Sequence, residues 1–277
     1  MEYVFLLIVF LFGAAVGSFI AVIGSRYNTG LPFLKGRSIC FSCNTVLQKK
    51  DLFPILSFLF LKGRCRYCDS KIPKETFIIE ILMGLLSVLA ALKSGFTFSD
   101  FSWLLSTNYC LLTTIFAVIL LISVYDLKHF IIPDSFLVSF FIFSFLYTLL
   151  LATGYWLLIV NLLSGIVLTI PFLLLFLISK GRWLGFGDVK YIAVLGFFLG
   201  LSQGLSAVVL AFWIGAAFAL VALLLKRFKS HFSLPTLVNN LTIKSEIPFG
   251  PFLSAGIIIS FYFNADLFQI HSLFNFF

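Results

Sequence analysis

The sequence contains apolar runs long enough to cross a lipid bilayer, and these runs limit the folds that the chain can adopt. Residues 3–23 carry no charged side chain over a length that spans the hydrocarbon core as a helix. Hydrophobic residues make up 61% of the chain and charged residues 11%, so a water-soluble fold could not cover this much apolar surface. We therefore expect an all-α polytopic membrane protein.

The distribution of Lys and Arg predicts the orientation of the chain. We predict about eight transmembrane helices, at about 3–23, 76–92, 108–125, 135–152, 157–179, 189–201, 205–225 and 248–264. The loops then alternate between two sides, and 18 of the 19 basic residues fall on one side, leaving only Lys93 on the other. By the positive-inside rule the basic side is cytoplasmic and both termini lie outside. Topology thus accounts for the net charge of +8, and we expect no nucleic-acid partner.

One long polar segment, residues 24–75, interrupts the apolar pattern. It contains two C-x-x-C pairs, formed by Cys40 with Cys43 and by Cys65 with Cys68. Two such pairs are typical of a tetrahedral Cys₄ zinc site, and a cytoplasmic location argues against the alternative of two disulfides. Four protein ligands leave no open position on the metal, so we expect a structural zinc. The sequence therefore predicts a first helix at 1–23, a zinc-binding insert at 24–75 and a membrane core at 76–277.

Two aspartates stand at the ends of apolar runs, where a carboxylate is costly to desolvate and usually has a function. Asp126 closes one run and Asp188 opens another, within Gly185-Phe186-Gly187-Asp188. Both fall at the same predicted membrane edge, where two carboxyl groups that share one proton could perform acid/base hydrolysis. The alternative is helix-end charge, with Asp188 capping a helix and Asp126 pairing with Lys128.

Two further acidic residues have structural interpretations. Asp134 follows Pro133, where its carboxylate can cap the next helix. Glu80 lies one turn inside the second apolar run, either as a partner of other polar groups or extended toward the interface.

The chain resembles the type IV prepilin leader peptidase/N-methyltransferase family over nearly its whole length. The resemblance rests on the order and spacing of motifs: Gly17-Ser18-Phe19, Gly36-Arg37-Ser38 before the first C-x-x-C, Pro54-Ile55-Leu56-Ser57, Lys62-Gly63-Arg64 before the second, Glu80, Asp126 with Ile132-Pro133-Asp134, Gly185-x-Gly187-Asp188-x-Lys190, and Ile247-Pro248-Phe249-Gly250-Pro251-Phe252.

This resemblance implies a bifunctional enzyme of the bacterial inner membrane. It would cut the leader from type IV prepilins or pilin-like proteins at the cytoplasmic face and then methylate the new N-terminal amine with S-adenosylmethionine. The family's two catalytic aspartates correspond to Asp126 and Asp188, and its four cysteines to the two pairs above.

Two other functions remain open at this point. A presenilin or signal-peptide-peptidase-like protease would share Tyr125-Asp126 and the Gly-x-Gly-Asp element, but the chain lacks that family's Pro-Ala-Leu element. A cation-coupled transporter could use the two aspartates as an ion site, but the chain has no internal repeat of the kind that transporters often show.

Overall fold

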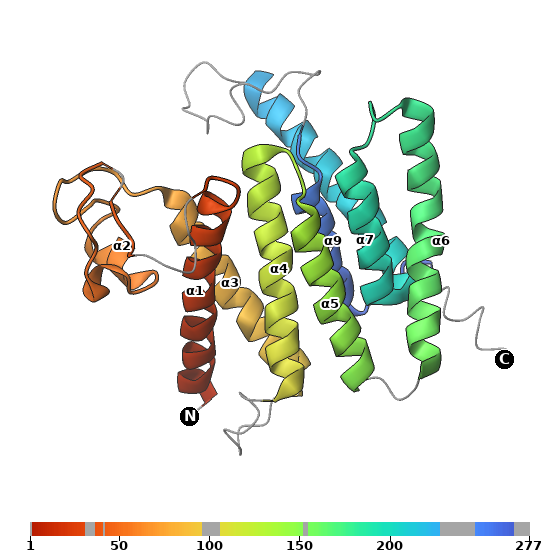
Figure 1. The fold of residues 1–277 in the computed structure, drawn as a ribbon, viewed down its shortest axis with the longest axis horizontal. Coiled ribbons are helices and arrows are strands. Elements are labelled where there is room, and N and C mark those ends of the chain that lie inside the picture. The colour runs from red at the N-terminus through yellow and green to blue at the C-terminus, as the bar shows by residue number, and fades with distance from the viewer. Residues whose placement is uncertain are drawn as a thin grey trace. The chain divides into compact units, whose positions relative to one another are not determined.

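The computed structural model describes residues 2–30, 37–40, 42–95, 106–151, 155–227 and 247–268, and it divides the chain into two compact units, residues 1–124 and 125–277. The elements are α1 (Glu2–Arg26), η1 (Lys49–Asp51), α2 (Leu56–Phe60), α3 (Lys74–Lys93), α4 (Thr107–His129), α5 (Asp134–Leu151), α6 (Tyr155–Ser179), α7 (Phe186–Arg227) and α9 (Gly250–Phe263) (Figure 1). Within the described residues only two isolated β-bridges accompany these helices. The predicted all-α class is confirmed.

In the first unit, small residues let α1 and α3 approach closely. A Cβ atom added to Gly13 would lie 2.4 Å from Cβ of Ser87, and one added to Gly17 would lie 2.9 Å from Cα of Glu80. Such contacts between backbones are how transmembrane helices gain packing energy in the absence of a hydrophobic driving force. The polar insert therefore leaves and rejoins the membrane through two closely packed helices.

In the second unit, α7 consists of two helical halves that fold back on each other at Gly200. This residue has φ 75° and ψ −179°, a conformation that is essentially restricted to glycine. A Cβ atom added to Gly204 would lie 3.4 Å from Cα of Gly196, whereas residues eight apart in a straight helix are about 12 Å apart. The break lies at Gly200, close to the boundary between the spans predicted at 189–201 and 205–225.

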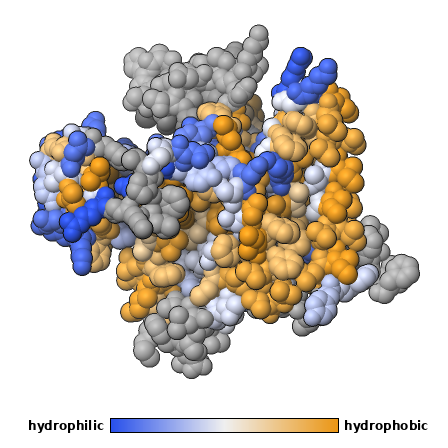
Figure 2. Space-filling view, viewed as in Figure 1, coloured by the Kyte–Doolittle hydropathy of each residue, from blue (hydrophilic) through white to orange (hydrophobic). Residues whose placement is uncertain are grey.

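The exteriors of these helices are suited to lipid. Among the residues that the structure describes, five helices are long and apolar enough to cross a membrane, namely α1, α3, α4, α6 and α7, while α5 and α9 are shorter apolar helices. Figure 2 shows hydrophobic residues over the sides of α5 and α6 and hydrophilic residues at the end where α6 leads into α7. The multi-pass class is thus established, whereas the number of eight crossings stays a prediction.

The two aspartates lie at slightly different places in their helices than the sequence predicts. Asp126 lies one turn inside the end of α4, which continues to His129, and Asp188 is the third residue of α7. The predicted cytoplasmic loop 226–247 lies largely outside the described residues, and so does Gly36 of the motif before the first C-x-x-C pair.

Candidate active site and metal centre

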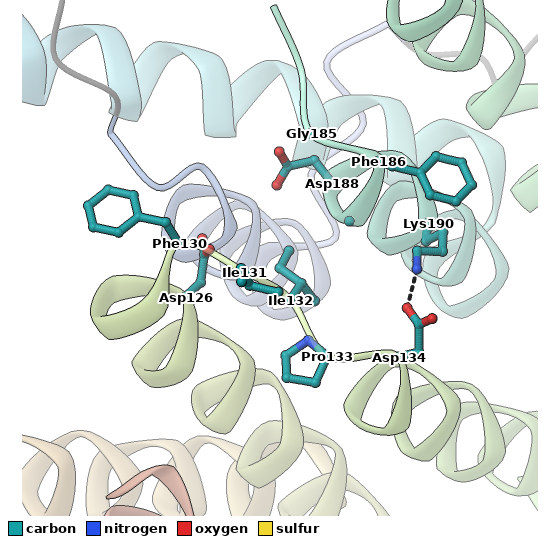
Figure 3. Close-up of a pocket in the computed structure, with 11 residues that line it drawn as sticks. Asp126, Phe130, Ile131, Ile132, Pro133, Asp134, Gly185, Phe186, Asp188 and Lys190 are labelled. Atoms are coloured by element: carbon teal, nitrogen blue, oxygen red, sulfur yellow. Dashed lines mark hydrogen bonds and ion pairs between the residues drawn. The ribbon is translucent and has the colours of Figure 1, made fainter. Parts of the chain in front are cut away.

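The second unit contains a pocket of about 460 Å³ that both candidate aspartates line. Its other walls are the connection from α4 to α5 and the first turn of α7, from Phe130 to Asp134 and from Gly185 to Lys190. In Figure 3 the carboxyl groups of Asp126 and Asp188 reach this space from two different helices. Asp126 and Asp188 both line this pocket, so the structure brings the two side chains to one site. The predicted juxtaposition of these side chains is therefore present.

Asp126 is held by the beginning of α9. The side chain is 4% exposed, and its Oδ2 accepts a 2.9 Å hydrogen bond from the backbone N–H of Gly250. Gly250 is the first residue of α9, so the carboxylate lies at a helix N-terminus, where negative charge is favoured. A Cβ atom at position 250 would lie 2.6 Å from Oδ2, and only glycine fits here without moving the acid.

Asp188 lies in the first turn of its helix. It is the third residue of α7, and its Oδ2 would lie 3.2 Å from a Cβ atom added to Gly185, the residue before the helix. A carboxylate in this position is favoured by the helix dipole, and the same carboxyl group lines the pocket. Gly187 permits close approach, because an added Cβ would lie 3.2 Å from Cβ of Ile132.

A separate ion pair lies at the rim of the pocket. Nζ of Lys190 donates to Oδ1 of Asp134, and the same ammonium group lies 5.0 Å from the ring centroid of Phe186. The side chains of Lys190 and Asp134 are 34% and 73% exposed, so this pair is solvated. Asp134 is the first residue of α5 and binds a cation on α7, and its predicted role as a helix cap stays a prediction.

The four predicted metal ligands come together in the first unit. The Sγ atoms of Cys40, Cys43, Cys65 and Cys68 all lie within 4.8 Å of one another, and all four thiols are free. Sulfurs at about 2.3 Å from a tetrahedral zinc lie about 3.8 Å apart. The separation of Sγ of Cys40 from Sγ of Cys68 is 3.8 Å, so the donor set and its spacing fit such an ion.

Two similar turns build this cluster. The first is closed by the bridge between Ile39 and Val46, and the second by the bridge between Arg64 and Lys71. The residue after each pair, Asn44 or Asp69, has a positive φ of 54° or 59°. Asn and Asp tolerate this left-handed conformation better than most residues, which allows each chain to turn back after its second cysteine.

Neighbouring groups favour thiolate at the cluster. The backbone N–H groups of Cys43 and Ser42 lower the pKa of the Cys40 thiol to about 6. Oγ of Ser70 lies 3.1 Å from Sγ of Cys68 and 3.7 Å from Sγ of Cys40. Such outer contacts orient ligands in metal sites.

The arginines beside the second pair contact carboxylates. Arg66 Nε donates to Oδ1 of Asp51 at 2.7 Å, and the Asp51 side chain is 3% exposed. Arg64 pairs with Asp69 at 2.9 Å in a solvated position. The first of these pairs ties η1 to the second cysteine turn.

Glu80 connects the insert to α3. It is 6% exposed, and its Oε2 accepts a 2.7 Å hydrogen bond from the backbone N–H of Ile55. Ile55 has φ 62°, an unfavourable value for a β-branched residue. Next to it, the ring of Phe58 stacks on Phe77 at 4.6 Å. This burial argues against extension of Glu80 toward the interface, while its role as a partner of the site residues stays a prediction.

Sequence reasoning did not assign roles to Gly250 or to the pairing of Lys190 with Asp134. Gly250, Lys190 and Asp134 all belong to motifs named in the sequence analysis. A motif does not indicate, however, which distant residue each of its members contacts in the folded chain. A Gly-Pro pair at the start of an apolar run, as at Gly250-Pro251, was the available signal for a helix N-terminus near a charged group.

The fold and the pocket define a class: a multi-pass helical membrane protein with two aspartates in one pocket and a four-cysteine cluster in a polar insert. Residues 11–94 match the bacterial peptidase A24 N-terminal domain, and residues 111–220 match the type IV leader peptidase family. Together with the relatives described next, these matches show that the chain belongs to the type IV leader peptidase family.

Three relatives illustrate the similarity. A prepilin leader peptidase/N-methyltransferase of Bacillus subtilis is 27% identical over 264 residues, which cover 95% of this chain and 96% of the relative. A protein of the same name from Aeromonas salmonicida is 30% identical over 83% of this chain and 70% of the relative. A type 4 prepilin-like proteins leader peptide-processing enzyme of Escherichia coli is 28% identical over 87% and 79%. No solved structure is significantly similar to the chain.

Proposed function

We propose that the chain is a membrane aspartyl endopeptidase that removes the leader of type IV prepilins or pilin-like proteins, and that it also methylates the new N-terminus. The observation that carries the peptidase activity is the pocket into which Asp126 and Asp188 project from α4 and α7 (Figure 3). Family membership supports this function over a presenilin-like protease or a cation-coupled transporter.

Two carboxyl groups that share one proton are sufficient for the hydrolysis. The ionised aspartate accepts a proton from water as the water oxygen attacks the scissile carbonyl carbon, and the protonated aspartate donates to the carbonyl oxygen. When the tetrahedral intermediate collapses, the C–N bond breaks, the amine nitrogen receives the proton that the first aspartate took from water, and the second aspartate regains a proton from a hydroxyl group of the intermediate. The N–H group of Gly250 keeps Asp126 oriented through these steps.

The rim of the pocket is consistent with a site at a membrane boundary. The helices that carry the pocket begin or end there, so a basic leader could remain in water while the following apolar segment enters the bilayer. We place this side in the cytoplasm of a bacterium, at the inner membrane, on the basis of the Lys and Arg distribution.

The insert would bind one zinc ion through Cys40, Cys43, Cys65 and Cys68. Bound there, the ion supplies no open coordination position, and its contribution is to hold the two cysteine turns together. Methylation rests on the family resemblance and on the relatives' names, with S-adenosylmethionine as the donor. The described residues do not by themselves define a donor site.

The deciding experiment incubates the purified protein with a prepilin and sequences the N-terminus of the product. Cleavage between leader and mature sequence, lost in Asp126→Asn, supports the proposal. Cleavage inside the apolar segment would indicate a presenilin-like protease. No cleavage, accompanied by cation-dependent transport in vesicles, would indicate a transporter.

A further inference from the structure

The insert of the first unit exposes a group of large apolar side chains in and next to α2. Phe60 is 80% exposed, Phe53 62% and Leu59 56%, and Leu52 and Leu56 are exposed as well. These five residues are called the α2 patch below. Large apolar patches on an otherwise polar segment mark surfaces that contact a membrane or another molecule.

Two contacts fix the segment that carries this patch to α3, a helix long and apolar enough to cross a membrane. The backbone N–H of Ile55 donates a 2.7 Å hydrogen bond to Oε2 of Glu80, and the ring of Phe58 stacks on that of Phe77 with centroids 4.6 Å apart. Ile55 has φ 62°, and such strain persists only where the surrounding contacts enforce it. The segment therefore has a defined position along α3.

That position lies deeper than the level at which α3 becomes apolar. The apolar run of α3 begins at Thr76, after Lys74 and Glu75, and Glu80 lies four residues further on, which is about 6 Å along the helix. Helices that lie in a membrane interface bury their apolar face about 5–10 Å into the boundary between headgroups and acyl chains. Figure 1 shows α2 level with the side of α1 rather than beyond its end. The medium around the α2 patch at this level is therefore lipid.

The surface of α3 supports the same depth. Ile78, between the two residues that hold the insert, is 52% exposed, as is usual for a side chain that faces acyl chains. The α2 patch thus continues the lipid-facing surface of α3 at the level of residues 77–80. A peptide or a second copy of the chain would have to displace the lipid that surrounds α3 there.

Basic residues border the α2 patch on both sides in the sequence. Lys49 and Lys50 precede it, Lys62 follows it, and all three are exposed. Ammonium groups beside an apolar surface attract anionic lipid headgroups while the apolar side chains enter the acyl region. This charge complementarity favours a phospholipid surface as the occupant.

We propose that the α2 patch lies in the lipid leaflet on the insert's own side and anchors the insert to the membrane surface. Acyl chains contact the apolar side chains, and headgroup phosphates lie near the three lysines. Since Cys65 follows Phe60 by only five residues, this anchor keeps the second cysteine turn next to the bilayer. The inference is independent of the proposed peptidase activity.

Photocrosslinking of the full chain tests the proposal. A photoreactive phenylalanine analogue replaces Phe60 in one version, and in the control it replaces Ser42, which is exposed in the first cysteine turn and lies outside the patch. Both proteins are irradiated in vesicles of phosphatidylethanolamine and phosphatidylglycerol. We expect lipid adducts at position 60 and few at position 42. Adducts of position 60 with protein alone, no lipid adducts, or equal lipid adducts at both positions would overturn the proposal.

Trypsin accessibility in the same vesicles gives a second measurement. Lys62 lies two residues after Phe60, so lipid contact shields the peptide bond after Lys62. Phe60→Asp should raise the rate of cleavage there about tenfold, because the apolar contact is lost and a charge enters the leaflet.

Two controls accompany this variant. Phe60→Leu keeps an apolar side chain, and Ser42→Asp adds the same charge outside the patch, so both should be cleaved after Lys62 at the wild-type rate. An unchanged rate for Phe60→Asp, or an equal rise for Ser42→Asp, would overturn the proposal. An equal rise after Lys71 would show that Phe60→Asp unfolds the insert, and the lipid adducts at position 60 then decide.

Discussion

The backbone N–H of Gly250 donates a 2.9 Å hydrogen bond to Oδ2 of Asp126, 124 residues earlier in the chain. This bond places the beginning of α9 against the last turn of α4, and it fixes one of the two acids on which the proposed hydrolysis depends. Gly250 therefore contributes to the active site by holding Asp126, although it does not itself line the pocket.

Gly250→Ala should impair cleavage strongly while leaving the fold intact. The added Cβ would lie 2.6 Å from Oδ2, so the carboxylate must move, and misplacement of a reacting group by about 1 Å can cost about a hundredfold in rate. Single-turnover cleavage of a prepilin measures the effect. Gly215→Ala, whose added Cβ would lie 3.3 Å from the ring of Phe252, serves as the control. Equal activity of the two variants would show that this contact does not position the acid.

Asp126→Asn and Asp188→Asn should each abolish leader cleavage while the protein still inserts into membranes, because each role requires an ionisable oxygen. Asp134→Asn should retain most activity. It removes only a solvated ion pair with Lys190, and such pairs contribute about 0–1 kcal/mol. Mass spectrometry of the pilin product measures leader cleavage by each of the three variants. An inactive Asp134→Asn together with an active Asp126→Asn would contradict the assignment.

We expect about one zinc ion per chain, with Zn–S distances near 2.3 Å. Cys40→Ser should lower the metal content and destabilise the insert, because one of four ligands is lost. Elemental analysis and X-ray absorption check both expectations, with Cys110→Ser, which lies outside the cluster, as the control. A folded, active and metal-free enzyme would refute the metal site.

The carboxylate of Asp51 should stabilise the insert more than that of Asp69. Burial of Asp51 opposes ionisation, but hydrogen bonds from Arg66, Tyr67 and the Gln48 backbone outweigh it, so the pKa of Asp51 lies below its usual value. Asp51→Asn should lower the unfolding free energy of the insert by about 1 kcal/mol at pH 7, whereas Asp69→Asn should have a smaller effect.

The pH dependence of this difference follows from the direction of the shift. Because the pKa of Asp51 is lowered in the folded state, its carboxylate stabilises the insert at pH values above the ordinary aspartate pKa of about 3.9. This stabilisation is lost as the pH falls below that value. Chelator-induced unfolding, followed by proteolysis of the insert, measures the difference between wild type and Asp51→Asn at pH 7 and at lower pH. A difference that grows on acidification would contradict the assigned direction.

Cleavage and methylation should be separable. Methyl transfer requires a deprotonated amine in line with its donor and has no need for an activated water. Asp188→Asn should therefore still add one methyl group to a pre-cleaved pilin while failing to cut a prepilin. Mass spectrometry distinguishes the two products. Absence of methylation even by the wild type would reduce the proposed activity to that of a peptidase alone.

Local patterns in the sequence determined the helices, the cysteine cluster and the pair of aspartates. Apolar runs such as 3–23 can satisfy their backbone in a bilayer only as helices, and the spacing within each C-x-x-C pair brings two sulfurs to one ion. Asp126 and Asp188 stood out because uncompensated charge is rare at the ends of apolar helices.

Long-range packing decided the rest. Three contacts join segments that lie 25 to 124 residues apart in the chain. They are the hydrogen bond from Gly250 to Asp126, the ion pair of Lys190 with Asp134, and the hydrogen bond from Ile55 to Glu80. Hydropathy is a property of each residue and its near neighbours, so it predicts that a helix forms without specifying which helix it meets. The side chain that a carboxylate finally contacts depends on how helix surfaces fit, and only the folded chain determines that fit.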